Sequence, residues 1–309
     1  MAVLDVGSNT VHLLIVDAHS GAAPIPFLSQ KYELKLAERI NSEGNIRKAA
    51  VNELIEVMHE CQAYVTEHDC VEILAFATSA VRDAGNSDDI LDAVRTETGI
   101  DLQVLDGDHE AILTFLAVRR WYGWSSGRLL VADIGGGSFE VAIGTDENPE
   151  LATSMPIGAG RLTRDFFTAD PPSDGEVKAL RKYVREVLEG QLSEILSHGK
   201  PNHVAATSKT FRQLSRIAGS APSSEGARVQ RLLTANDLAK WVPRLAEMPS
   251  SDRAKLPGVS VGRAEQLLAG AIVAQEAMEL LQVTEFEICP WALREGIILR
   301  RLDWFSDDV

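Results

Sequence analysis

The sequence is poor in cysteine and in positive charge, and each shortage excludes a class of protein. Three cysteines, Cys61, Cys70 and Cys289, are spread over 309 residues. They are too few for a disulfide framework and too scattered for a C-x-x-C metal or redox pair, so we expect a cytoplasmic protein with reduced thiols. The net charge of -15 argues against nucleic acid as a bulk partner, because such binding needs clustered lysine and arginine.

Long apolar runs are also missing. No run approaches the roughly 18 residues of a membrane span, and the opening residues Met1 to Asp5 lack the basic region of a secretion signal. We therefore expect neither membrane insertion nor secretion. With 45% hydrophobic and 24% charged residues, the chain can bury a substantial core and is long enough for two domains of ordinary size.

Strand and helix patterns alternate along the chain, which predicts an α/β fold with a mixed sheet covered by helices. Apolar, strand-like segments fall at 3–6, 11–17, 71–77, 101–106, 129–134, 139–144 and 151–155. Apolar residues at helical spacing predict helices near 47–66, 88–98, 109–121, 174–197, 263–282 and from 293 to about 302. Glycine, serine and proline make 219–228 a loop by composition.

An internal repeat is the most informative feature. A shift of 128 residues lays Asp5-Val6-Gly7-Ser8-Asn9-Thr10 onto Asp133-Ile134-Gly135-Gly136-Gly137-Ser138, and the flanking apolar strands coincide as well. In each copy an apolar strand ends in aspartate, turns through glycine and small polar residues, and returns as another strand. We expect two similar α/β halves whose turns both point into one cleft.

Each of these turns can present successive backbone N–H groups to an anionic oxygen cluster. Glycine suits such a turn, because a side chain would keep the phosphate away. One copy alone is better explained by an ordinary hairpin. Two aligned copies favour phosphate binding by residues 7–10 and 135–138, that is Gly7, Ser8, Asn9, Thr10, Gly135, Gly136, Gly137 and Ser138.

Acidic residues beside an anion site indicate a hard cation between them and the substrate. Asp133 and Glu140 flank the second turn and Asp5 precedes the first. Mg²⁺ takes oxygen ligands and is held by one or two carboxylates plus phosphates, so we predict Mg²⁺, or alternatively Mn²⁺, at these residues. The alternative is that Asp133 caps the turn and Glu140 is a solvated strand residue.

The chain resembles the exopolyphosphatase and guanosine pentaphosphate phosphatase (Ppx/GppA) family, within the superfamily of sugar kinases, Hsp70 and actin. The resemblance runs from end to end, and its specificity lies in the order and spacing of its motifs: residues 4–10, 77–84, 107–111 and 133–140, then Gly158-Ala159-Gly160-Arg161-Leu162, Leu256-Pro257-Gly258 with Arg263-Ala264, and Leu293-Arg294-Glu295-Gly296. It implies a duplicated actin-like, ribonuclease H-like fold. We expect domains at 1–122 and 123–309, with the last helix packing back on the first.

Carried over by position, the resemblance implies that Glu110 is the catalytic base that activates water and that Arg82 binds substrate phosphate. From the sequence alone, a helix-terminal glutamate that complements the macrodipole is the better explanation of Glu110. Arg82 could be a surface arginine paired with Asp83 or Glu110. Arg263 and Arg294 are further candidate phosphate ligands.

Other conspicuous residues point to structure rather than chemistry. The seven histidines, His109 among them, show no ligand spacing, and the pair His68-Asp69 stands alone. Trp121 and Trp124 could stack a base, but packing or a role at a domain edge is the expectation. Nucleotide-binding members of the superfamily carry a glycine-rich turn where this chain has Thr207-Ser208-Lys209-Thr210, which favours inorganic polyphosphate over a nucleotide.

The predicted function is therefore an exopolyphosphatase that releases terminal orthophosphate from polyphosphate by metal-assisted water attack. The nearest alternative is a guanosine pentaphosphate phosphohydrolase. A kinase or filament protein and a silent guanosine tetraphosphate-binding module are further alternatives, the last disfavoured because Glu110 and Glu140 are both present. A homodimer is expected. Because the sequence stops at Val309, without the helical modules of longer relatives, we expect distributive hydrolysis and a preference for short chains.

Overall fold

A computed structural model describes residues 1–19 and 21–304 of the chain. Contacts group the chain into two compact units, one formed by residues 1–113 with 293–309 and the other by residues 114–292. The domain limits expected from the sequence, 1–122 and 123–309, stay a prediction.

The first unit is built on a five-stranded mixed sheet with strand order β3-β2-β1-β4-β5. Strands β1, β2 and β3 form an antiparallel meander, and β4 and β5 extend it in parallel with β1. Its strands are β1 (Ala2–Val6), β2 (Thr10–Ile15), β3 (Leu28–Glu33), β4 (Ile73–Ala77) and β5 (Leu102–Val104). Its helices are α1 (Lys48–Glu67), α2 (Ser79–Arg82), α3 (Ser87–Thr98) and α11 (Leu293–Trp304).

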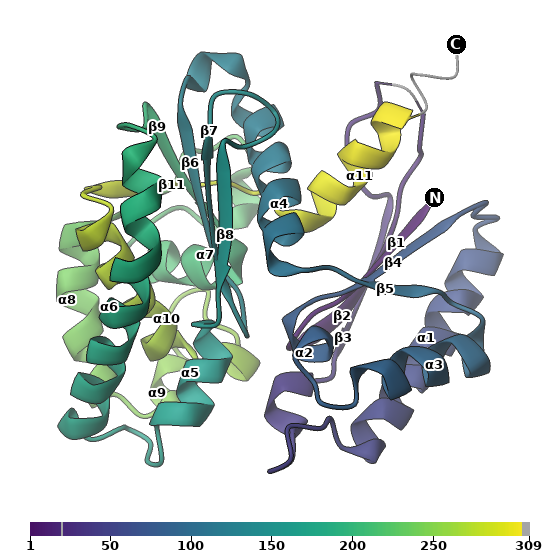
Figure 1. Ribbon diagram of the computed structural model, residues 1–309, viewed down its shortest axis with the longest axis horizontal. Coiled ribbons are helices and arrows are strands. Elements are labelled where there is room, and N and C mark those ends of the chain that lie inside the picture. Colours follow the sequence, from purple (N-terminus) through teal and green to yellow (C-terminus); the bar gives the residue numbers. More distant parts are fainter. Residues whose placement is uncertain (20, 305–309) are drawn as a thin grey trace. The chain divides into compact units, whose positions relative to one another are not determined.

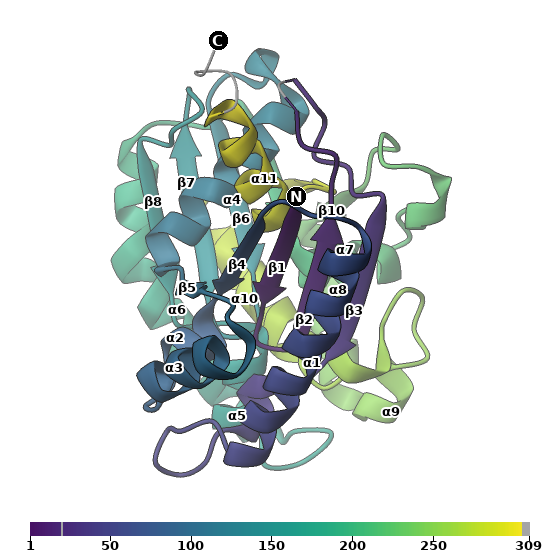
Figure 2. The same cartoon turned by 90° about the vertical axis from the view of Figure 1, so that its right-hand side faces the viewer.

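Alternation along β1 explains how both faces of this sheet are covered. Its even-numbered residues share an apolar cluster with Leu54 and Met58 of α1, whereas Val3 clusters with Ile297 and Leu302 of α11. Figure 1 and Figure 2 show α1 and α3 together on one face of the sheet and α11 on the other. Because β1 is covered on both faces, it is apolar at every position except Asp5.

The second unit contains a six-stranded mixed sheet with order β10-β11-β9-β6-β7-β8. Its strands are β6 (Leu129–Ile134), β7 (Phe139–Gly144), β8 (Leu151–Met155), β9 (His203–Thr207), β10 (Leu232–Thr234) and β11 (Glu285–Ile288). Its helices are α5 (Ala159–Phe166), α6 (Asp174–Ser197), α7 (Ser208–Ile217), α8 (Ala235–Glu247), α9 (Ser250–Arg253) and α10 (Leu267–Leu280). Helix α4 (Gly107–Tyr122) begins in the first unit and continues into the second.

The two sheets share one topology. Replacing β1, β2, β3, β4 and β5 by β6, β7, β8, β9 and β11 reproduces the strand order of the first unit in the second. The antiparallel and parallel pairings correspond as well. The repeat predicted from the sequence is therefore a structural duplication, and the expected actin-like α/β fold is confirmed.

The last helix of each repeat covers the sheet of the other repeat. Helix α4 follows β5, but its residues Phe115 and Val118 pack with Leu129 and Val131 of β6. Helix α11 follows β11 and packs on β1. The two repeats have exchanged their terminal helices.

Several short elements differ from the sequence-based expectation. Strands β3, β10 and β11 and helices α5, α7 and α8 have no counterpart in the predicted set, and the expected helix over 263–282 begins at Leu267, after a 3₁₀ turn at Val261–Arg263. The loop at 219–228 contains a 3₁₀ turn at Ser223–Glu225. Within the described residues, no helix is both long and apolar enough to cross a membrane.

Candidate active site

The two repeated turns adopt the same backbone geometry. The Gly7 N–H donates to the Thr10 carbonyl at 3.0 Å, and the Gly135 N–H donates to the Ser138 carbonyl at 2.9 Å. The flanking residues pair in the same register, Val6 with Val11 and Ile134 with Phe139. The two aligned sequence segments thus form hairpins with the same turn hydrogen bond and the same strand register.

Neighbouring segments hold the first turn in place. The Asn9 carbonyl accepts hydrogen bonds from the N–H groups of Leu34 and Lys35 at 3.1 and 3.0 Å, and the Ser8 carbonyl accepts one from Ala37 at 3.1 Å. The buried Ser8 hydroxyl lies 2.9 Å from the hydroxyl of Ser79, the first residue of α2. The bound carbonyls of Ser8 and Asn9 share their peptide units with the N–H groups of Asn9 and Thr10. In a trans peptide these N–H groups point away from the carbonyls.

Helix α4 starts next to this turn's sheet and carries Glu110. The Asp106 carboxylate caps the helix by accepting the His109 N–H at 2.8 Å, and it also contacts His109 Nδ1 at 2.6 Å. The backbone hydrogen bond from His109 is the main cause that lowers the pKa of Asp106. The capped first turn therefore fixes the backbone from which Glu110 projects.

Glu110 and Arg82 are brought together by the fold. Arg82 Nη1 lies 3.3 Å from a Glu110 carboxylate oxygen and donates to the Leu105 carbonyl at 3.1 Å, while Arg82 Nε donates to Asp83 at 3.1 Å. Side-chain exposure is 20% for Arg82 and 16% for Glu110. The ion pair considered as a structural explanation for Arg82 thus exists, and it joins the two residues to which the resemblance assigns chemistry.

Asp5 lies in the interior of the first sheet. Burial is the main cause that raises the pKa of its carboxyl, the positive charge of Arg294 opposes this, and Glu295 adds to it. The fold therefore places the charge of Arg294, a predicted phosphate ligand, near the first turn. Across the hairpin Asp5 pairs with His12, whose ring Nε2 lies 2.7 Å from the Ser29 hydroxyl.

The second turn is held by the start of α5. Ala159 N–H donates to the Gly135 carbonyl at 3.0 Å, Arg161 N–H donates to the Gly136 carbonyl at 2.9 Å, and Arg161 Nε donates to the Gly137 carbonyl at 3.0 Å. Within the described part of the chain, the N–H groups of Gly136, Gly137 and Ser138 donate no backbone hydrogen bond. These three donors can therefore bind an anion.

Asp133 and Glu140 face each other across the β6–β7 hairpin, so their side chains lie on the same face of the sheet. Glu140 is buried, with 3% exposure, and accepts a hydrogen bond from the Ser154 hydroxyl at 2.8 Å. In residues 1–19 and 21–304, no three His, Cys, Asp or Glu side chains are grouped as a protein-only metal site would require. Two carboxylates on one face suit a cation such as Mg²⁺ that takes its other ligands from water and substrate.

Position 208 shows how the chain replaces a glycine-rich turn. Ser208 has φ 94° at the junction of β9 and α7, a conformation that glycine favours. Next to it, the Thr207 hydroxyl donates to the Trp291 carbonyl at 2.9 Å, and Arg212 Nε donates to the Ser208 carbonyl at 3.1 Å. One residue of this segment thus takes a backbone conformation that glycine favours, although the segment contains no glycine.

Arg263, Trp121 and Trp124 are the other residues that the sequence singled out. Arg263 ends a 3₁₀ turn in the second unit. Trp121 packs edge-on against Trp291, with ring centroids 5.2 Å apart, and beneath the guanidinium of Arg228. Trp124 is 64% exposed. The packing role expected for Trp121 fits these contacts.

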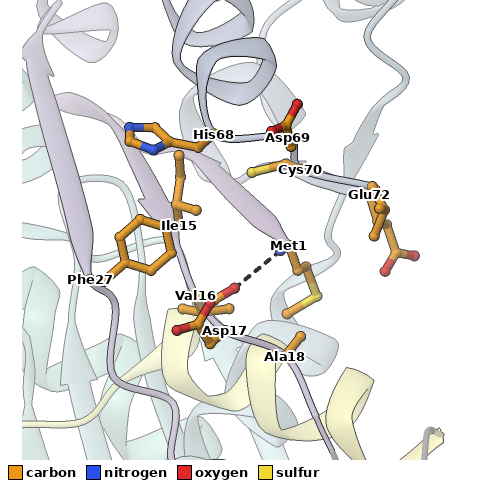
Figure 3. Close-up of a pocket in the computed structure, with 11 residues that line it drawn as sticks. Met1, Ile15, Val16, Asp17, Ala18, Phe27, His68, Asp69, Cys70 and Glu72 are labelled. Carbon is orange, nitrogen blue, oxygen red and sulfur yellow. Dashed lines mark hydrogen bonds between the residues drawn. The ribbon is translucent and has the colours of Figure 1, made fainter.

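A pocket of about 260 Å³ in the first unit lies at the far end of β1 from the Gly7–Thr10 turn. Met1, Val16, Phe27, His68 and Glu72 are among its lining residues. In Figure 3 the carboxylates of Asp69 and Glu72 point away from the ring of His68, and the only polar contact drawn is the bond from the Met1 ammonium to the Val16 carbonyl. The polar groups do not converge, so this pocket is not the candidate active site.

Sequence reasoning missed three supporting residues: Ser79, Ser154 and Arg161. Each acts through a partner that is distant in the sequence, such as Ser79 with Ser8, 71 residues away. For Arg161 a signal existed, because Gly158 and Gly160 precede it in a motif that had no assigned role. Two glycines at the start of a helix indicate close backbone approach.

Comparisons with known proteins agree with this arrangement. Exopolyphosphatase 1 of Mycobacterium tuberculosis (strain ATCC 25618 / H37Rv) is 53% identical over 307 residues, which cover 99% of this chain and 89% of that protein. Exopolyphosphatase 2 of the same organism is 29% identical over 318 residues, with 97% of each chain covered.

Solved structures are similar over nearly the whole chain. An exopolyphosphatase from Cytophaga hutchinsonii has a TM-score of 0.87 at 26% identity, covering 98% of this chain and 97% of that one. The Aquifex aeolicus PPX-GPPA enzyme has a TM-score of 0.80 at 27% identity, covering 97% and 98%. The family described as Ppx/GppA phosphatase matches residues 14–305. This chain therefore belongs to the Ppx/GppA phosphatase family.

Proposed function

We propose that this protein is an exopolyphosphatase that releases terminal orthophosphate from inorganic polyphosphate. The observation that carries the proposal is the second turn, where, in the described part of the chain, three successive N–H groups donate no backbone hydrogen bond and the carbonyls of the same peptide units are held by α5. The similarity to proteins named exopolyphosphatase supports polyphosphate as the substrate.

In the proposed mechanism, phosphate oxygens of the substrate bind the N–H groups of the repeated turns at 7–10 and 135–138. Glu110 positions and deprotonates the attacking water, and Arg82 both orients the Glu110 carboxylate and neutralises phosphate charge. This division suits phosphoryl transfer, in which positioning and electrostatic stabilisation supply most of the rate. The contact of 3.3 Å between Arg82 and Glu110 supports their acting as one unit.

A divalent cation completes the proposal. Asp133 and Glu140 would hold it, with Asp5 as a further acidic residue in the first unit, and the ion would supply charge neutralisation on the phosphate oxygens. Mg²⁺ fits best because two carboxylates leave room for water and substrate ligands. The cytoplasmic location, the homodimer, Arg263 and Arg294 as phosphate ligands and the preference for short chains also stay predictions.

Guanosine pentaphosphate is the second candidate substrate. The positive φ of Ser208, a conformation that a glycine-rich turn would also allow, is the specific observation in its favour. Phosphate release should be measured side by side on polyphosphate, guanosine pentaphosphate and ATP at equal Mg²⁺. We expect the highest kcat/KM on polyphosphate. A higher value on guanosine pentaphosphate would reverse the order of the two candidates, and release from none of them would refute the proposed activity.

A further inference from the structure

The start of α5 binds three successive carbonyl groups of the second turn. The acceptors are the carbonyls of Gly135, Gly136 and Gly137, and the donors are the backbone N–H groups of Ala159 and Arg161 and the Nε of Arg161, at 2.9 to 3.0 Å. The first N–H groups of a helix have no partner within the helix. Here two of them are used to fix the turn.

Each fixed carbonyl shares a planar peptide unit with an N–H group of the next residue. Those N–H groups belong to Gly136, Gly137 and Ser138, and in a trans peptide they point away from the carbonyl. Anchoring the carbonyls on α5 therefore aims all three N–H groups to the opposite side. These are the donors to which we assign substrate phosphate.

The glycines before Arg161 are required by this close approach. A Cβ at Gly158 would lie 2.3 Å from the Gly137 carbonyl carbon and 2.3 Å from the Ser138 nitrogen, and one at Gly160 would lie 3.0 Å from the Gly136 carbonyl oxygen. Side chains at either position would push α5 off the turn. The motif Gly158-Ala159-Gly160-Arg161 thus encodes a helix start that fits against the turn backbone.

Resting on the proposed function, we propose that Arg161 is a positioning residue that acts through the Gly137 carbonyl. Its guanidinium Nε holds the peptide unit that carries the Ser138 N–H. The hydrogen bond from Nε also polarises that peptide, which makes its N–H a stronger donor to phosphate. Arg161 thereby tunes the anion-binding strength of the turn.

Two substitutions separate this role from a direct charge effect. In Arg161→Gln the amide nitrogen occupies the side-chain position of Nε, so the donor is kept and the charge is lost. In Arg161→Lys the charge is kept, but a methylene group replaces Nε. We expect Arg161→Gln to keep kcat/KM within about threefold of the wild-type value. Arg161→Lys and Arg161→Met, which both lack the donor, should each lower kcat/KM about tenfold. Lys178→Gln, on the exposed side of α6, controls for the loss of a surface charge and should have no effect.

The backbone amide signal of Ser138 in ¹H–¹⁵N spectra gives a readout that is independent of turnover. This signal should shift in the Lys and Met variants, which lose the hydrogen bond, and stay near its wild-type position in the Gln variant. Orthophosphate added as a probe should also shift it if the Ser138 N–H binds phosphate. If Lys preserves activity and the Ser138 signal while Gln behaves as Met does, the positioning role is wrong. If the signal follows the expected order but wild type releases no phosphate from polyphosphate, the positioning role holds and the proposed activity fails.

Discussion

Glu110 has an ordinary structural explanation, the helix macrodipole, and a proposed chemical one, the activation of water. A glutamate in the first turn of a helix complements the macrodipole wherever it occurs. Here the same residue also lies 3.3 Å from Arg82, whose guanidinium is tied to the Leu105 carbonyl. This contact is also the ion pair that a structural role for Arg82 would produce, so the catalytic role of Glu110 stays a prediction.

Glu110→Gln should reduce kcat by about 100-fold or more, because the shape is kept and the basic carboxylate is lost. Substrate binding should survive. Steady-state phosphate release gives kcat, and a binding assay with polyphosphate gives the affinity. Glu97→Gln, exposed on α3, is the matched control. Near-normal turnover in Glu110→Gln would remove this residue from the mechanism.

Asp133→Asn and Glu140→Gln should raise the Mg²⁺ concentration needed for half-maximal activity, because each removes negative charge from the proposed cation site. Ser154→Ala should cause a smaller increase, since it removes only the hydrogen bond that orients Glu140. Magnesium titrations of phosphate release measure all three. Curves for the Asp133 and Glu140 variants that overlay wild type would show that neither residue is near the ion.

Candidate site residues whose side-chain chemistry stands out within a sequence motif could be proposed from the sequence. Residues whose role depends on contact with a distant partner could not. The turns, Asp133, Glu140, Glu110 and Arg82 stand in motifs of fixed spacing. The Ser154 hydroxyl and the Arg161 guanidinium matter only because β8 and α5 bring them to Glu140 and to the Gly137 carbonyl. No local pattern encodes the approach of Ser154 to Glu140, whereas for Arg161 the close approach is indicated by Gly158 and Gly160 alone.

At the scale of elements, the predicted limits are accurate where the periodic apolar pattern extends over many residues. Short strands were missed. The limits of β6, β7, β8 and α6 agree with the predicted ranges. Strands β10 and β11 span three and four residues, which is too short for alternation to stand out. Strand β3 is half-exposed throughout, so it lacks the apolar content that marked the other strands.

Two helical glycines should respond in opposite directions to alanine. In Gly296→Ala the new Cβ would lie 1.9 Å from the Leu113 carbonyl oxygen, so α11 must shift from α4 and the free energy of unfolding should fall by about 1–3 kcal/mol. In α6, a Cβ added at Gly190 would meet no atom within 4 Å. Gly190→Ala should therefore raise the free energy of unfolding by about 0.5–1 kcal/mol.

Chemical denaturation of both variants and wild type measures these changes. Because the two substitutions add the same methyl group to a helix, the difference between them reports packing rather than helix propensity. Equal effects of the two substitutions would contradict the close approach of α11 to α4.

At the scale of the whole molecule, a net charge of -15 opposes the approach of a polyanion. Salt screens this repulsion, since the Debye length falls from about 30 Å at 0.01 M to about 10 Å at 0.1 M. We expect kcat/KM for polyphosphate to rise severalfold over this range at constant free Mg²⁺. Triphosphate, with fewer charges, should show a smaller rise. A decrease with salt would mean that a local positive potential governs the encounter.

The exchange of terminal helices has a consequence for how the protein is made. The sheet of the first repeat is complete once β5 has been synthesised, but one of its faces stays uncovered until α11 supplies Ile297, Ile298 and Leu302. Nearly the entire chain must therefore leave the ribosome before Val3 and Leu14 are shielded from water. During that interval the nascent first repeat exposes an apolar face, the kind of surface that chaperones bind. The second repeat has no such delay, because α4 is already synthesised when β6 emerges.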